Sequence, residues 1–190
     1  MRHIDFVGIS SIAWTILLLY WVYTGMKTKI TVKRQATLPR VVYLAIMITG
    51  FSFVFGKFMS IGWLGSKFLP PLKWLPYLGL LINLAGIILA IVARAWLGNN
   101  WSGIVTIKKD HELIRSGPYS ITRHPIYTGL LFGLFGVAII IGEWRALLGV
   151  LILFFAIQLK IKAEEKMLSN EFPEYREYKR QTKKLIPLIY

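Results

Sequence analysis

The chain has 190 residues, of which 55% are hydrophobic and 17% are charged, and its mean hydropathy is +0.55. Soluble domains carry about a quarter charged residues, so this composition excludes an ordinary soluble domain and favours an integral membrane protein. The net charge of +14 would suggest a nucleic-acid partner in a soluble chain, and the absence of cysteine excludes disulfides, thiolate metal sites and a cysteine nucleophile.

Five apolar runs predict transmembrane helices, because crossing a bilayer core of about 30 Å takes roughly 20 apolar residues. In chain order they are Ile4–Tyr23, Val41–Phe55, Trp74–Leu97, Ile126–Ile141 and Ala146–Gln158. The second run is short, and we expect it to continue toward Trp63. Only residues 142–145 separate the last two runs, which predicts a tight antiparallel helical hairpin. The predicted fold is all-α, a single polytopic membrane domain over residues 1–190.

The positive residues outside these runs predict the orientation of the chain. Alternating spans leave 17 Lys and Arg residues on one side of the membrane and five on the other. Positive residues favour the cytoplasmic side, so we expect the 98–125 segment and the C-terminus in the cytoplasm and the N-terminus on the opposite side. Topology and attraction to anionic headgroups then explain the basic excess, and no nucleic-acid partner is expected. A signal peptide is a weaker interpretation of the first run, which is too long and too aromatic and lacks a cleavage site.

The fourth run carries Gly129, Gly133 and Gly136 on adjacent parts of one helix surface. Close packing against another helix is the favoured interpretation. The alternative is that these glycines leave space for a ligand or a lipid chain.

Polar residues concentrate in the 98–125 connection, which is far longer than joining two helices requires and therefore indicates a function. Within it, residues 105–108 are expected to be a short extended piece. Pro125 suits the first turn of the fourth helix, and the free amides there, flanked by Arg123 and His124, predict an anion site. The alternatives are that Arg123 and His124 anchor the helix to lipid phosphates, and that Tyr119 and Tyr127 belong to an interfacial aromatic belt. No metal site is predicted, because the histidines lack metal-binding spacing.

A second polar stretch begins at Lys160, where the fifth run leaves the membrane. Lys160 and Glu164 are i,i+4 neighbours and Glu165 follows, which is typical of an exposed helix with intrahelical ion pairs. The alternative is that the paired acids bind sugar hydroxyls or balance a cationic ligand. Residues 172–180 then alternate aromatic and basic side chains, for which docking at the membrane interface is favoured.

Together these residues resemble a known family. The run His111-x-Leu113-x-x-x-Gly117-x-Tyr119-x-x-x-Arg123-His124-Pro125-x-Tyr127-x-Gly129 closely resembles the C-terminal signature of the isoprenylcysteine carboxyl methyltransferase family. The pair Glu164-Glu165 and residues 172–178 are also similar to that family, so the resemblance covers about residues 98–190. At 190 residues the chain looks like the compact prokaryotic members. The wider superfamily includes phospholipid N-methyltransferases, and similar patterns occur in NADPH-dependent membrane sterol reductases.

The resemblance implies S-adenosylmethionine as the methyl donor and S-adenosylhomocysteine as the product. It divides the domain into three N-terminal spans, residues 1–97, and a cofactor-binding and catalytic part, residues 98–190. The implied cofactor-binding residues are His111, Glu112, Leu113, Ile114, Tyr119, His124, Pro125, Ile126, Tyr127 and Glu164. The candidate catalytic residues are Arg123, Lys160 and Glu165, and Lys160 falls where the eukaryotic members place a substrate-binding arginine.

The resemblance and the composition together predict a membrane methyltransferase, in the cell membrane if the protein is prokaryotic. We expect a lipophilic acceptor that enters between the helices, with Gly129, Gly133 and Gly136 shaping its tunnel. A carboxylate acceptor is favoured because it is already ionised at neutral pH and needs no general base. An amine would need one, which draws attention to Glu165 or a tyrosine. The alternatives are a phospholipid or amine N-methyltransferase, an NADPH-dependent membrane reductase and a non-catalytic scaffold.

Overall fold

The computed structural model describes residues 4–34, 37–102, 105–109 and 112–186, which are mostly helical. The α-helices are α1 (Phe6–Gly25), α2 (Thr37–Phe55), α3 (Leu75–Leu97), α4 (Pro125–Ile141), α5 (Trp144–Glu171) and α6 (Tyr175–Gln181). Short 3-10 turns are η1 (Lys57–Met59), η2 (Gly62–Gly65), η3 (Gly98–Asn100) and η4 (Gly117–Ser120). Two antiparallel strands, β1 (Thr31–Arg34) and β2 (Thr106–Lys108), form a small sheet. Strand β2 confirms the extended piece expected at residues 105–108, whereas its pairing with β1 was not part of the all-α expectation.

Three helices are long and apolar enough to cross a membrane: α1, α3 with its 3-10 extension to Asn100, and α5. The apolar stretches Arg40–Phe55 and Pro125–Ile141 are helical but shorter. A helix therefore stands at each of the five expected positions, and the number of crossings stays a prediction. The expected continuation of the second span toward Trp63 is wrong, because α2 ends at Phe55 and residues 57–65 form η1 and η2.

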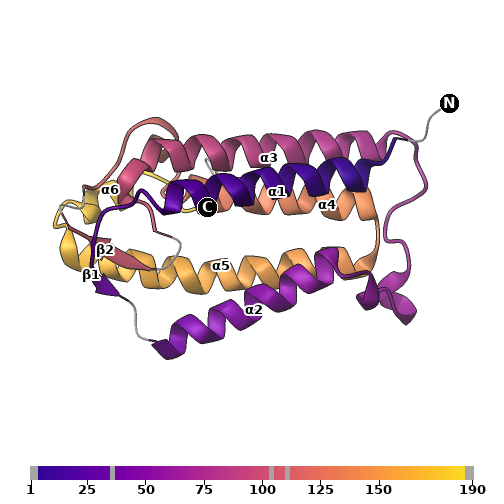
Figure 1. Ribbon diagram of the computed structural model, residues 1–190, viewed down its shortest axis with the longest axis horizontal. Coiled ribbons are helices and arrows are strands. Elements are labelled where there is room, and N and C mark those ends of the chain that lie inside the picture. Colours follow the sequence, from indigo (N-terminus) through magenta and orange to yellow (C-terminus); the bar gives the residue numbers. More distant parts are fainter. Residues whose placement is uncertain (1–3, 35–36, 103–104, 110–111, 187–190) are drawn as a thin grey trace.

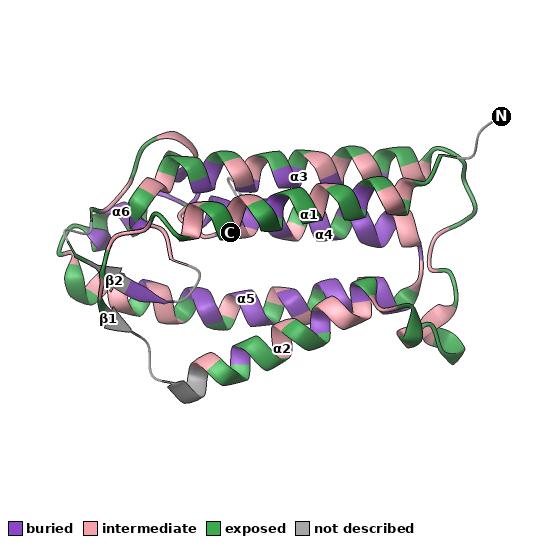
Figure 2. Ribbon diagram, viewed as in Figure 1, coloured by how far each residue is buried: buried purple, intermediate pink, exposed green. Residues whose placement is uncertain are grey.

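The helices lie in two layers, with α1, α3 and α4 in one and α2 and α5 in the other (Figure 1). Within them, α3 packs along α4, and α2 packs along α5. Buried Leu134, Val137, Val150 and Leu153 join the layers in one hydrophobic cluster, which also includes Val54 of α2. The outer surfaces of α1 and α2 carry many exposed apolar side chains, as expected of surfaces that face lipid (Figure 2).

The glycines of α4 bring its backbone against α3. A Cβ atom on Gly129 would lie 2.5 Å from the carbonyl oxygen of Gly86, and one on Gly136 would lie 2.4 Å from the amide nitrogen of Asn83. Close helix packing is therefore confirmed for Gly129 and Gly136, whereas the expectation that they shape a tunnel is wrong. The Asn83 side chain reinforces the contact by donating to the carbonyl of Gly133 over 2.9 Å.

The turn between α4 and α5 is shorter than expected, because only Gly142 and Glu143 lie outside the two helices. Gly142 ends α4 in the left-handed conformation, with φ of 67°. The buried guanidinium of Arg145 bonds both this turn and α2. Its Nε donates to Glu143 over 2.6 Å, and its Nη1 donates to the carbonyls of Phe53 and Val54. Arg145 thus satisfies carbonyls at the end of α2 and fixes that helix against α5.

Candidate active site

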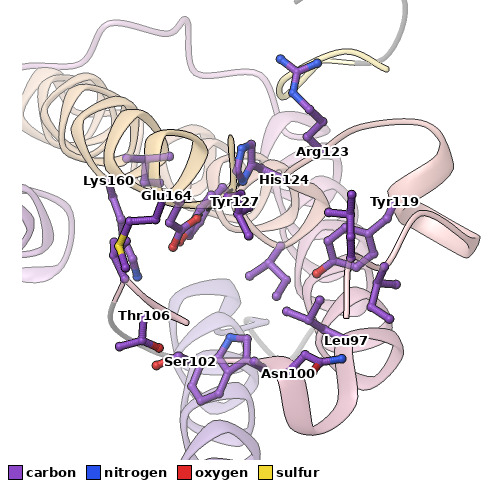
Figure 3. A pocket seen from close by; sticks show the side chains of 18 of the residues that line it. Leu97, Asn100, Ser102, Thr106, Tyr119, Arg123, His124, Tyr127, Lys160 and Glu164 are labelled. Carbon is purple, nitrogen blue, oxygen red and sulfur yellow. Dashed lines mark hydrogen bonds and ion pairs between the residues drawn. The ribbon is translucent and has the colours of Figure 1, made fainter. Parts of the chain in front are cut away.

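A cavity of about 310 Å³ lies at the end of the bundle that carries β1, β2 and α6 (Figures 1 and 3). Its walls come from α1, α2, the 97–124 region, α4, α5 and α6. Most of the lining is apolar or aromatic, and the charged side chains in it are Glu112, Arg123, His124, Lys160 and Glu164. An apolar cavity with a few convergent polar groups is the usual form of a small-molecule site.

The cavity brings together ten of the predicted site residues. These are Glu112, Leu113, Ile114, Tyr119, Arg123, His124, Ile126, Tyr127, Lys160 and Glu164. Pro125 is buried at the first position of α4 and does not line the cavity, and neither does Glu165. His111 lies outside the described residues. The 98–125 connection and the tail from Lys160 therefore meet at one place, although they are far apart in the sequence.

Glu164 joins the start of α4 to α5. Its Oε1 accepts a hydrogen bond of 2.6 Å from the Tyr127 hydroxyl, and its Oε2 lies 3.6 Å from Nδ1 of His124. The imidazole of His124 stacks on the ring of Tyr127, with the ring centroids 5.7 Å apart. The Glu164 side chain keeps 20% of its surface exposed, so the carboxylate can still accept further hydrogen bonds from a ligand in the cavity.

Lys160 lies one helical turn before Glu164 and is 8% exposed. Its ammonium faces two aromatic rings, with Nζ 5.3 Å from the centre of Tyr127 and 5.8 Å from the centre of Tyr43. Both distances are within the range of cation–π attraction. Tyr43 belongs to α2, in the part of the chain that carries no family motif, so sequence reasoning missed it.

Arg123 and Glu165 form a buried ion pair beside the cavity. Arg123 Nε donates to Glu165 Oε1 over 2.8 Å, and its Nη1 bonds the carbonyls of Lys179 and Thr182. Glu165 Oε2 also lies 3.0 Å from Lys179 Nζ, so both carboxylate oxygens have cationic partners. The Arg123 guanidinium points away from the cavity in Figure 3. The geometry therefore places Arg123 and Glu165 as supports of His124, 3.4 Å from Glu165, and does not bring Glu165 to the cavity as a general base.

The C-terminal segment covers the start of α4. The amides of Arg123 and His124 donate to the carbonyls of Lys183 and Lys184 over 2.8 Å and 3.2 Å, and Thr128 Oγ1 donates to Leu185 over 2.6 Å. The C-terminal segment therefore lies directly beside the first turn of α4, and the anion site expected at the amides of that turn stays a prediction. No pattern in the sequence predicts this contact between the C-terminal segment and the start of α4.

The tyrosines near α6 are interior residues. Tyr119, Tyr175 and Tyr178 are at most 6% exposed, so these three rings pack inside the protein, and docking of the surrounding stretch at the membrane interface stays a prediction. The Tyr178 hydroxyl donates to the carbonyl of Tyr119 over 2.7 Å and ties α6 to η4. Burial raises the pKa of Tyr178 to about 12 and also raises the pKa of Tyr119, so both phenols stay protonated and neutral at physiological pH.

Several buried polar atoms in the cavity wall have no hydrogen-bond partner among the described residues. They are Nε1 of Trp21, the hydroxyls of Tyr43 and Tyr175, and Oγ1 of Thr106. Buried polar groups are almost always hydrogen-bonded in native proteins, so these four atoms are exceptions in the wall of the cavity. None of the four was expected from the sequence, because a tyrosine, tryptophan or threonine in an apolar run is typical of packing.

The sequence of this chain is similar to a known family model and to several known proteins. The model of the isoprenylcysteine carboxyl methyltransferase family matches residues 78–170. The cobalt-zinc-cadmium resistance protein CzcN of Cupriavidus metallidurans is 37% identical over 61% of this chain and 52% of its own length. The protein-S-isoprenylcysteine O-methyltransferase of Saccharomyces cerevisiae is 33% identical over 59% of this chain and 48% of its own length.

The fold also matches a solved structure. The structure of a eukaryotic intramembrane Ras methyltransferase, isoprenylcysteine carboxyl methyltransferase, superposes with a TM-score of 0.57 and 24% identity. The match covers 82% of this chain and 54% of that one. The chain spans about half the length of the curated relatives named above. The membrane-type fold is thus shared over most of the chain, while the relatives have further sequence outside the match.

Proposed function

Because the chain belongs to the isoprenylcysteine carboxyl methyltransferase family, we propose that it is an integral membrane enzyme that transfers a methyl group from S-adenosylmethionine to a lipophilic carboxylate. The proposal includes five membrane crossings, a cytoplasmic cavity and location in the cell membrane. The 17-to-5 distribution of Lys and Arg supports that orientation.

The observation that carries this proposal is the cavity that Tyr127, His124 and Glu164 line, in which a carboxylate with acceptor capacity left for a ligand meets apolar and aromatic walls. The donor set fits S-adenosylmethionine, which supplies an electrophilic methyl group on sulfur when it is bound. Glu164 has acceptor capacity for ribose hydroxyls or for the ammonium group. Trp21 and Trp101 offer aromatic surface for the adenine ring, and a cavity of about 310 Å³ lies within the size range of small-molecule sites.

Lys160 is the residue that we assign to the acceptor. Lys160 lines the same cavity as apolar Leu44, Met47 and Ile157, so the cavity offers both a cation for a carboxylate and apolar surface for a hydrocarbon chain. A carboxylate is ionised at neutral pH, and the site then has to align oxygen, methyl and sulfur and exclude water. The involvement of Glu165 in ion pairs with Arg123 and Lys179 supports this assignment over an amine acceptor, because an amine needs a general base.

Calorimetric titration of the detergent-solubilised protein with S-adenosylhomocysteine tests the proposed cofactor, with NADPH titrated in parallel. We expect saturable binding of S-adenosylhomocysteine and none of NADPH. Lys160→Gln should leave that binding within about twofold, because Lys160 is assigned to the acceptor. Binding of NADPH in place of S-adenosylhomocysteine would favour a membrane reductase, and binding of neither would favour a scaffold.

A further inference from the structure

A second cavity, of about 250 Å³, lies between the last turns of α1 and α3. Tyr20, Thr24 and Lys27 line it from the α1 side, and Arg94 and Asn99 line it from the α3 side. Both helices are long and apolar enough to cross a membrane, and the cavity lies where their C-terminal ends leave the apolar stretch. It is distinct from the candidate active site, with which it shares no lining residue.

Arg94 is the unusual feature of this cavity because its charge is buried without an acid. The residue is 3% exposed, and its Nη1 and Nη2 donate to the carbonyls of Gly98 and Thr24 over 2.8 Å and 3.0 Å. Those bonds use two of the five N–H donors of a guanidinium. Its Nε is buried and has no hydrogen-bond partner, and no carboxylate pairs with Arg94 within the part of the chain that the structure describes.

Helix ends alone do not balance this charge. The carbonyls that Arg94 contacts belong to the C-terminal ends of α1 and α3, where the helix dipoles offer partial negative charge. Lys27, however, adds a second cation to the same cavity, with its Nζ bonded to the Tyr23 hydroxyl over 2.7 Å. Two positive residues therefore line one cavity, and its lining contains no acid. Because a buried charge is costly unless it is paired, the arrangement calls for an anion from outside the chain.

We propose that this cavity binds a phosphate-bearing anion, namely the headgroup of an anionic phospholipid. Phosphate matches the fork of guanidinium donors and can engage the Nη1 and Nη2 hydrogens of Arg94 that the two carbonyls leave unused, together with the ammonium of Lys27. A lipid is the favoured source because the cavity lies at the end of membrane-spanning helices, where headgroup phosphates are concentrated. The acyl chains would then lie along the exposed apolar surface of α1, which includes Ile12, Ile16 and Leu19.

The site is connected to the candidate active site through one ring. The guanidinium of Arg94 lies 4.3 Å from the centre of the Trp101 ring, and Trp101 packs against Trp21 with ring centroids 5.9 Å apart. Both tryptophans line the larger cavity. A headgroup that holds Arg94 in place therefore also holds a wall of that cavity, and lipid binding should tighten the binding of S-adenosylhomocysteine. This second effect rests on the proposed function, whereas lipid binding does not.

Lipid titration of the maltoside-solubilised protein, read by native mass spectrometry, tests the site directly. Dioleoylphosphatidylglycerol is the probe, and dioleoylglycerol is the control with the same chains and no phosphate. We expect Lys27→Gln to weaken phosphatidylglycerol binding about fivefold, the factor expected from one basic residue at an anionic lipid surface. Arg94→Gln should weaken it by tenfold or more. Lys166→Gln, an equal charge change at an exposed position of α5, should leave it unchanged.

Lys27→Gln keeps the test decisive if Arg94→Gln does not fold. Equal binding of dioleoylglycerol, or equal loss in the Lys27 and Lys166 variants, would overturn the site. A second arm measures the thermal unfolding midpoint with added inorganic phosphate: a rise that Lys27→Gln abolishes would identify free phosphate as a ligand of the same site. Phosphatidylglycerol binding without any S-adenosylhomocysteine binding would support the lipid site and reject the proposed function, and the reverse result would do the opposite.

Discussion

The Tyr127 hydroxyl donates a 2.6 Å hydrogen bond to Glu164 Oε1 and so joins the first turn of α4 to α5. The two residues are 37 positions apart, and each belongs to a different polar cluster of the sequence. Their bond holds the Glu164 carboxylate at the cavity wall, where it is the acid that we assign to the cofactor.

Tyr127→Phe removes this hydrogen bond and keeps the ring that faces Lys160 and His124. A hydrogen bond to a charged group contributes about 1.5–3 kcal/mol, so we expect binding of S-adenosylhomocysteine to weaken by about tenfold or more in calorimetry. Tyr77→Phe is the matched control, because Tyr77 is 56% exposed and does not line the cavity. Equal affinities for the two variants would contradict the role of the Tyr127–Glu164 bond.

The neighbouring acids Glu164 and Glu165 should respond differently to the same substitution. Glu165→Gln leaves Arg123 buried without its carboxylate, and breaking a buried pair in this way costs about 3–5 kcal/mol, so the thermal unfolding midpoint should fall by many degrees. Glu164→Gln should change the midpoint little and weaken S-adenosylhomocysteine binding at least about tenfold, the loss expected for an uncharged acceptor.

Thermal unfolding in detergent, followed by calorimetry at a temperature where both variants are folded, separates the two acids. A stable Glu165→Gln protein that fails to bind S-adenosylhomocysteine would reject the supporting role of Glu165 and would favour direct contact with the ligand.

The sequence predicts the parts of this site that lie in its motifs, but not the residues that other helices contribute through tertiary packing. His124, Tyr127 and Glu164 belong to the stretches that resemble the family, and the structure brings all three to one cavity. Helix positions were also predictable, because an apolar run of membrane length has few alternatives to a helix. Hydrophobicity does not determine which helices neighbour each other, so the contribution of Tyr43 from α2 could not be predicted.

The contacts that the sequence did not predict have a common physical cause. The burial of Tyr178 and the pairing of residues 123–124 with the C-terminal segment were missed because local patterns do not report which distant segment covers a residue. In the structure Tyr178 bonds the carbonyl of Tyr119, and the amides of Arg123 and His124 bond the 183–184 backbone. Aromatic and basic residues suit both an interface and a buried support, so composition alone favours neither.

Thr128→Val tests the C-terminal segment that covers α4. The substitution keeps the shape of the side chain and removes the 2.6 Å bond to the Leu185 carbonyl, which should cost about 1 kcal/mol. We expect faster hydrogen exchange of the backbone amides in residues 182–186. Thr15→Val is the control, because Thr15 bonds only Ser11 in its own helix. The same exchange rates in both variants would show that Thr128 does not hold this segment.

Gly136→Ala tests the contact between α3 and α4. Its Cβ would lie 2.4 Å from the backbone nitrogen of Asn83, which cannot move without shifting α3, so we expect destabilisation of about 1–3 kcal/mol. At Gly25 the nearest atom to an added Cβ is a Trp101 side-chain atom at 3.4 Å, so Gly25→Ala should be close to neutral. Equal unfolding midpoints for the two variants would contradict the packing described for α4.

The most direct test of the proposed reaction uses membranes from cells that express this chain, incubated with methyl-labelled S-adenosylmethionine. A methyl ester releases volatile methanol in alkali, whereas an N-methyl group is stable. We predict alkali-labile label in the lipophilic fraction that depends on the wild-type chain and is lost with Glu164→Gln. Alkali-stable label, or no label above membranes without the chain, would contradict methylation of a lipophilic carboxylate.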